Sequence, residues 1–143
     1  MLEWAEKFET GHTLIDTQHR MLISYINRLE ELAQNTNPEP EDRGLFLQFI
    51  SFLEDYISMH FGMEEDRMRR FRCSAHKDNK KAHTEFMDFY RGFTRRLHGQ
   101  EHRPEMIQEL HEACSTWVKA HILRIDVQMK HCQVECLKLE APE

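Results

Sequence analysis

Glycine, proline and long apolar runs are scarce in this 143-residue sequence, which holds 5 Gly and 4 Pro. Because both residues interrupt helices, their scarcity predicts long helices joined by short breaks. No tract alternates apolar and polar residues over a useful length, which argues against a β-sheet. No apolar run approaches the roughly 18 residues of a membrane span, and residues 1–8 lack the basic start and apolar stretch of a secretory signal. We therefore expect an all-α protein in the cytoplasm, with no membrane partner.

A surplus of positive charge is also absent. The net charge is −6, and Lys and Arg are dispersed among acids. The one basic cluster, at residues 67–72, directly follows three acids, as at a solvated helix end. Without a basic face, nucleic acid is not an expected partner. The cysteines form no C-x2-C pair, so we expect thiols kept reduced by the compartment; they are Cys73, Cys114, Cys132 and Cys136.

The length fits one domain covering residues 1–143, and the breaks divide it into an arm and four helices. The arm covers residues 1–13. The expected helices are Leu14–Gln34, Glu41–Arg70, His76–Leu97 and Pro104–Leu137. Four amphipathic helices with short connections favour an antiparallel up-down-up-down four-helix bundle.

Steps of three and four residues predict the face that each helix turns inward. The first helix gives Ile15, His19, Leu22, Ile26, Leu29 and Ala33. The second gives Phe46, Phe49, Leu53, Tyr56, His60 and then Met63 or Glu64. The third gives Asn79, His83, Phe86, Tyr90, Phe93 and Leu97, and the fourth gives Met106, Leu110, Ala113, Trp117 and His121.

Polar residues stand near one end of every stripe, and in an up-down-up-down bundle these ends meet. The chain holds ten histidines, and four of them fall in this layer with two carboxylates and one amide. The seven residues are His19, His60, Glu64, Asn79, His83, His121 and Asp126. A single histidine on such a stripe is more often a hydrogen-bonded core residue, and a metal-free structural bundle remains an alternative. Burying two carboxylates without cations, however, costs several kcal/mol for each.

Four imidazoles and two carboxylates suit iron, manganese or zinc better than calcium or magnesium, and they are too many for one tetrahedral zinc. Two metals bridged by Glu64 and Asp126, each with two imidazoles, would use all six side chains. His121 and Asp126 are five residues apart, about 140° around a helix. Asp126 must therefore reach in obliquely, or the helix must loosen there.

The motifs of this layer resemble those of the bacterial hemerythrin-like domains. Residues 15–19 read IDTQH, residues 60–68 read HFGMEEDRM, and residues 117–126 read WVKAHILRID. Trp4 in the arm and the His83–Phe86 pair also match the family pattern. The resemblance covers residues 1 to about 130.

The resemblance implies a centre of two iron ions, joined by an oxo or hydroxo group, that binds dioxygen. By position, His19 and His60 would bind one iron and His83 and His121 the other. Glu64 and Asp126 would bridge the pair. The residues expected to line the dioxygen pocket are Phe61, Trp117 and Ile122. A plain core role is an equal alternative for each of them.

One position departs from the family, which has a histidine where this chain has Asn79. An amide oxygen is a poor iron ligand, so we expect a vacant or water-filled position there. His76 could replace the missing ligand only if the third helix began late. An open iron oxidises faster and admits small anions, nitric oxide or peroxide, which suits a sensor better than a carrier.

The leading interpretation is a dioxygen or redox sensor domain that is not itself an enzyme. Alternatives are a di-iron oxidase or a catalyst that consumes peroxide or nitric oxide, an oxygen or iron storage and carrier protein, and an iron sensor. Residues 127–143 would then form a helix extension that leads to an output domain, or a frayed end packed on the bundle.

Other positions support or surround this centre. Acceptors for the second imidazole nitrogens are expected among Asp16, Gln18, Glu65 and Tyr56. Cys132 and Cys136 share one helix face, where buried or idle thiols are favoured over redox-active ones. The remaining histidines are assigned to the surface: His12, His98, His102, His111 and His131.

Overall fold

A computed structural model describes residues 1–35, 40–99 and 104–132, and these residues form helices without strands. The elements are η1 (Glu6–Phe8), α1 (Thr13–Ala33), α2 (Pro40–Arg70), α3 (His76–Gly99), α4 (Pro104–Arg124) and η2 (Asp126–Gln128). The expected all-α class is correct. Within the described ranges, no helix has the length and apolar character needed to cross a membrane.

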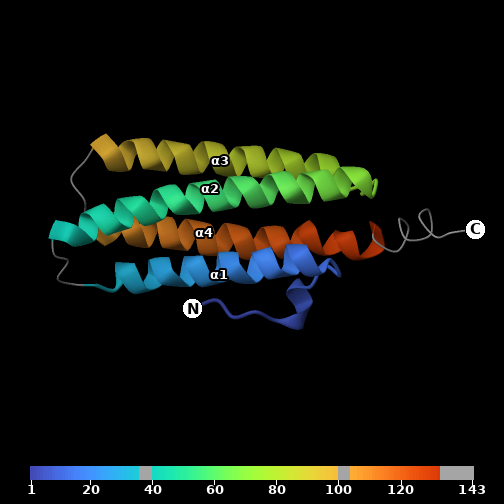
Figure 1. Ribbon diagram of the computed structural model, residues 1–143, viewed down its shortest axis with the longest axis horizontal. Helices are drawn as coiled ribbons and strands as arrows, with labels where there is room; N and C mark the ends of the chain where they lie inside the picture. Colours follow the sequence, from blue (N-terminus) through green and yellow to red (C-terminus); the bar gives the residue numbers. More distant parts are fainter. Residues whose placement is uncertain (36–39, 100–103, 133–143) are drawn as a thin grey trace, which may run out of the picture.

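The four long helices alternate in direction along the bundle axis (Figure 1). α1 contacts α2 and α4, and α3 contacts the same two helices. The starts of α1 and α3 therefore lie at the same end as the ends of α2 and α4. This topology is the predicted up-down-up-down bundle, and it gathers the polar ends of the four stripes.

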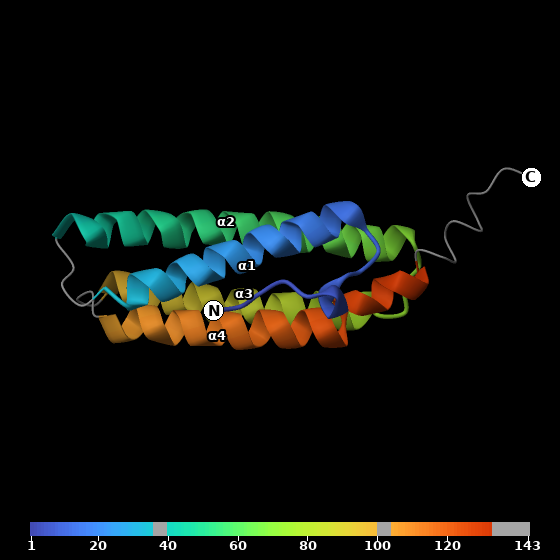
Figure 2. The same cartoon turned by 90° about the horizontal axis from the view of Figure 1, so that it is seen from below.

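The N-terminal arm runs back along α1 and α4 (Figure 2). Its η1 turn contacts α4 and buries Phe8 in the core. The Leu2 amide donates to Asn27 Oδ1 at 3.0 Å, and Asn27 Nδ2 donates to the Leu2 carbonyl at 2.8 Å. This two-way hydrogen bond ties the arm to α1.

The predicted core faces are correct for α3 and, apart from two positions, for α2. All six stripe residues of α3 are buried. On α2, Ile50 and Ile57 are buried, whereas Phe49 and Tyr56 are only half-buried. Tyr56 keeps its hydroxyl at the rim, where it donates to the Gln18 carbonyl at 2.8 Å. An amphipathic aromatic at a boundary can fill a stripe position without entering the core.

The fourth helix is not continuous to Leu137 as predicted. α4 ends at Arg124, Ile125 is a turn, and the chain re-enters helix through η2. In a straight helix Asp126 would point about 140° away from His121. The break removes this constraint and lets Asp126 be buried.

Residues 133–143 lie outside the described residues, and with them Cys136 and most of the predicted extension. The described part of that extension packs on the bundle. Met129 and Cys132 are buried in a small cluster. The other members are Ile15, Met68, Cys73 and Ala75.

Cys73 and Cys132 form a disulfide across 59 residues of sequence, with their Cα atoms 5.2 Å apart. The prediction of free thiols is therefore wrong for this pair. One cysteine follows α2 and the other follows η2, and only the bundle topology brings these segments together. Cys114 is free and buried, and burial raises its pKa to about 12.

Replacing Cys73 by serine is expected to lower the free energy of unfolding by roughly 4 kcal/mol. A cross-link across about 59 residues removes closure entropy from the unfolded chain, and the substitution restores it. Denaturant titration of oxidised wild type and of the variant measures the difference. Reductant should destabilise wild type but leave Cys73→Ser unchanged; equal responses would contradict the cross-link.

Candidate metal centre

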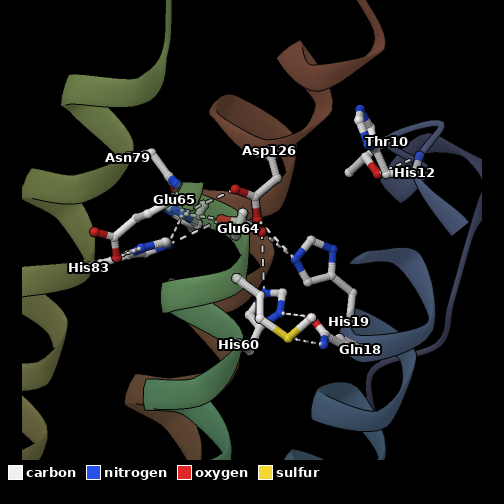
Figure 3. Close-up of polar contacts among 12 residues, drawn as sticks. Thr10, His12, Gln18, His19, His60, Glu64, Glu65, Asn79, His83 and Asp126 are labelled. Atoms are coloured by element: carbon white, nitrogen blue, oxygen red, sulfur yellow. Dashed lines mark hydrogen bonds and ion pairs between the residues drawn. The ribbon is translucent and has the colours of Figure 1, made fainter. Parts of the chain in front are cut away.

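Six potential ligand side chains converge inside the bundle at one end (Figure 3). They come from all four long helices and from η2: His19, His60, Glu64, His83, His121 and Asp126. Each is at most 6% exposed. They form two groups whose ligand atoms lie within 4.8 Å of one another, and Glu64 belongs to both.

Glu64 presents one carboxylate oxygen to each group. Its Oε2 lies 3.0 Å from His19 Nε2 and 3.2 Å from His60 Nε2. Its Oε1 lies 3.1 Å from His83 Nε2 and 3.8 Å from His121 Nε2. His60 and Glu64 are one helical turn apart on α2, so both can face one centre.

Asp126 repeats this arrangement from the opposite side of the layer. Its Oδ2 lies 3.2 Å from His19 Nε2, and its Oδ1 lies 3.2 Å from His121 Nε2. Two carboxylates that each share their oxygens between two imidazole pairs have the connectivity of bridging ligands.

Two of the four acceptors expected from the sequence contact imidazole rings and orient them. His60 Nδ1 lies 2.7 Å from Gln18 Oε1, and His83 Nδ1 lies 3.0 Å from Glu65 Oε2. Both acceptors favour the tautomer with the proton on Nδ1, which leaves Nε2 free toward the centre. Gln18 is held in turn, because its Nε2 lies 3.0 Å from Met63 Sδ.

The other two expected acceptors, Asp16 and Tyr56, do not contact these rings. Asp16 Oδ1 accepts from the amide and the hydroxyl of Thr10, each at 2.9 Å, and so fastens the arm to the start of α1. Tyr56 positions Gln18 through the backbone. No described residue hydrogen-bonds His19 Nδ1, although that atom is buried.

Two buried carboxylate oxygens of the layer have no hydrogen-bond partner among the described residues, as is expected of metal ligands. Glu64 Oε1 and Asp126 Oδ1 are buried and accept no well-aligned hydrogen bond, despite the nearby imidazole nitrogens. His83 Nε2 and His121 Nε2 lie only 3.1 Å apart. Lone pairs that converge in this way are stabilised when a cation lies between them.

The two carboxylates raise the proton affinity of the imidazoles when no metal is bound. Burial alone would lower the pKa of His19, but Asp126 and Glu64 raise it to about 10. Burial alone would also lower the pKa of His121, but the same carboxylates raise it to about 9. Burial would raise the pKa of Glu64, but the surrounding imidazoles, His60 first, hold it well below its usual value. Protons on His19 and His121 thus balance the two negative charges.

Metal binding at pH 7.5 is therefore expected to release about two protons per chain, since imidazole must be deprotonated to act as a ligand. His19 and His121 supply them, because their pKa values of about 10 and about 9 lie above this pH. Titration calorimetry in two buffers of different ionisation enthalpy measures the release. Release should fall toward zero above pH 10, and heats independent of the buffer at pH 7.5 would contradict the prediction.

Aromatic rings cover the His83 and His121 side of the layer. The Phe61 ring stacks on His83, with centroids 3.7 Å apart and an interplanar angle of 3°. The Trp117 ring stacks on His121 at 4.4 Å and 10°. Ile122, the third predicted lining residue, is buried in the same core cluster. The two stacked rings each cover one face of an imidazole.

Asn79 lies beside this layer but outside both potential ligand groups. It is fully buried, and its Oδ1 lies 2.8 Å from His121 Nε2. His76 begins α3, is half-buried and also lies outside both groups.

His12 is a residue whose environment the sequence prediction missed. The sequence predicts a surface position, yet His12 is 3% exposed and its ring centroid lies 5.2 Å from that of Phe71. Burial, together with the charge of Arg67, lowers its pKa. No local pattern marks it, because the folded arm and the segment after α2 create its surroundings. His98 and His131 are exposed as predicted, His111 is half-buried, and His102 lies outside the described residues.

Several bacterial proteins are similar to this chain in sequence. A bacteriohemerythrin of Clostridium acetobutylicum is 29% identical over 127 residues, covering 88% of this chain and 96% of that protein. A bacteriohemerythrin of Pseudomonas aeruginosa is 26% identical over 141 residues, covering 96% and 87%. One from Methylococcus capsulatus is 24% identical over 127 residues, covering 88% and 92%. Residues 10–130 match the profile of the hemerythrin HHE cation-binding domain, and the chain belongs to that family.

Proposed function

We propose that the chain is a non-haem di-iron domain that binds dioxygen and acts as an oxygen or redox sensor rather than as an enzyme. His19 and His60 would hold one iron, and His83 and His121 the other. Glu64 and Asp126 would bridge them.

The observation that carries this proposal is the division of each carboxylate between the two imidazole pairs. Glu64 Oε1 and Oε2 lie within 3.2 Å of imidazole nitrogens from different pairs. Asp126 does the same with Oδ1 and Oδ2. A single cation would leave one pair and one oxygen of each carboxylate without a ligand role. The mixed nitrogen and oxygen set is of the kind that suits iron.

When bound, the iron pair would supply electrons that dioxygen can accept and return. The protein would hold that chemistry in place. Gln18 and Glu65 fix the tautomers of His60 and His83. Phe61 stacks on His83 and Trp117 stacks on His121, and these rings would limit the water around the centre. A dry site slows proton transfer to a bound ligand and so favours reversible binding.

Iron analysis joined to absorption spectra before and after admission of air tests the proposal. We expect both sites to fill with iron, and near-ultraviolet charge-transfer bands to appear in air and to fade under reductant. A protein that retains no iron, or whose iron does not react with dioxygen, would contradict the proposed function.

The sensor role rests on the position of Asp126. This bridging candidate lies in η2, between α4 and the segment that the Cys132 disulfide fastens to the end of α2. A change at the iron pair would therefore act directly on the junction that leads to the C-terminal segment. We propose that an output domain there receives the signal, in the cytoplasm.

An open position beside Asn79, which the sequence predicts, would favour a second candidate function, a di-iron oxidase or a catalyst that consumes peroxide or nitric oxide. Storage or transport of oxygen would instead require that the iron pair be oxidised irreversibly only slowly, so that it survives many binding cycles. Steady-state consumption of each substrate with a supplied reductant separates these functions. A sensor reacts about once for each site, whereas a catalyst continues to turn over.

A further inference from the structure

We propose that Asn79 forms a binding position for a small anion on the metal held by His83 and His121, with the Asn79 amide as hydrogen-bond donor. The inference rests on the proposed metal centre and names a ligand class for it. It concerns the one amide of the layer, whose side chain is neither an imidazole nor a carboxylate.

The Asn79 side chain is buried and turned toward the imidazoles (Figure 3). Its Oδ1 lies 2.8 Å from His121 Nε2. Its Nδ2 is buried and has no hydrogen-bond partner among the described residues. A buried amide N–H without an acceptor costs about 1–3 kcal/mol, so this donor is set for a partner that the protein does not itself supply.

Metal binding changes what Asn79 can contact. His121 Nε2 can donate to Asn79 Oδ1 only while it carries a proton, and a metal ligand carries none. The amide then loses its one contact in the layer. Because the oxygen and nitrogen of an amide can exchange places by rotation, Nδ2 can turn toward whatever occupies the adjacent coordination position.

The charge of the centre selects an anion for that position. The protein supplies only the carboxylates of Glu64 and Asp126, which do not neutralise two divalent or trivalent cations. An N–H donor and an excess of positive charge both stabilise a negatively charged ligand with exposed lone pairs. Azide, nitrite, fluoride and hydroperoxide have this chemistry.

A groove on the surface reaches the same side of the centre. It has a volume of about 430 Å³ and lies between α3 and α4, where its lining includes His121, Trp117 and Arg124. Arg124 is exposed and makes no ion pair with a described residue. Asp78 also lines this groove, so its charged lining is mixed. A smaller groove of about 220 Å³ reaches His83 between α2 and α3, and its arginine, Arg91, is paired with Glu54.

Azide titration of the metal-loaded protein, followed by absorption spectra and calorimetry, tests the position. We expect Asn79→Leu, which removes the donor, to weaken azide binding by roughly 10- to 100-fold. We expect Asn79→His, which can fill the position with an imidazole, to eliminate the Asn79-dependent azide site and to lower the azide stoichiometry. Asn79→Ala repeats the loss of the donor with a smaller side chain, in case leucine prevents folding.

Two matched arginine variants test whether azide approaches through the larger groove. Arg124→Gln is expected to slow azide association by roughly 2- to 10-fold at low salt, and Arg91→Gln to leave it unchanged. Equal slowing by both would overturn the assignment of this groove. Wild-type azide affinity and stoichiometry in all three Asn79 variants would overturn the position itself.

The two proposals fail in different ways. A chain that takes up no metal, or whose iron ignores dioxygen, contradicts the proposed function before azide is added. A chain that loads metal and reacts with dioxygen, yet binds azide identically with and without the Asn79 amide, contradicts only this inference.

Discussion

Glu64→Gln is expected to lose both metal ions. Glu64 is the residue common to the two potential ligand groups, and each of its oxygens lies within 3.2 Å of imidazole nitrogens. Glutamine has nearly the same shape but no negative charge, and its NH₂ group would face imidazoles that must themselves act as ligands. Loss of an outer partner of a metal ligand already costs roughly 10- to 100-fold in affinity. We expect a loss of at least about 100-fold for this shared ligand.

Metal analysis after purification and competition with a colorimetric chelator measure the effect. Asp55→Asn is the matched control, because it removes one carboxylate from an exposed position on the same helix. The control should bind metal as wild type does. Full metal content in Glu64→Gln would show that Glu64 is not a ligand, and the bridged centre would have to be abandoned.

Removal of metal is expected to lower the midpoint of thermal unfolding by more than about 10 °C. Ligands that bind only the folded state stabilise it by about 4 kcal/mol at a free concentration of 1,000 times the dissociation constant. For a chain of this size, 1 kcal/mol shifts the midpoint by roughly 2–4 °C or more. The metal-free layer also keeps Glu64 Oε1 and Asp126 Oδ1 buried without aligned hydrogen bonds.

Calorimetric or circular-dichroism melts with and without a strong chelator measure this shift. Glu64→Gln supplies the control, since a chain that holds no metal should not respond to the chelator. A wild-type midpoint that stays within about 2 °C after verified metal removal would contradict the coupling between metal and fold.

The bundle and the converged layer could be predicted because both follow from periodicity. The spacing of three and four placed the inward residues of α3 correctly, and the antiparallel order then put His19, His60, His83 and His121 at one end. Apart from Asp126, every residue of the layer could be identified as a polar side chain on an apolar stripe. That these side chains bind iron remains a prediction.

Periodicity could not resolve choices of a single residue. The inward line of α2 passes through Ile50 and Ile57, whereas Phe49 and Tyr56 were predicted. Either choice has helical spacing with Leu53 and His60, and neighbouring residues differ by about 100° around the axis. Tyr56 stays at the rim, where its hydroxyl donates to the Gln18 carbonyl, and Ile57 is buried.

The local sequence therefore determined the helices, their order and the chemical character of the inner layer, since these depend on contacts along each helix. Only the tertiary structure decided the break at Ile125, the burial of His12 and the Cys73–Cys132 disulfide. The physical reason is distance in sequence. Each of these features depends on segments that meet only after the bundle closes. No pattern within one segment predicts which residues of the other segment will contact it.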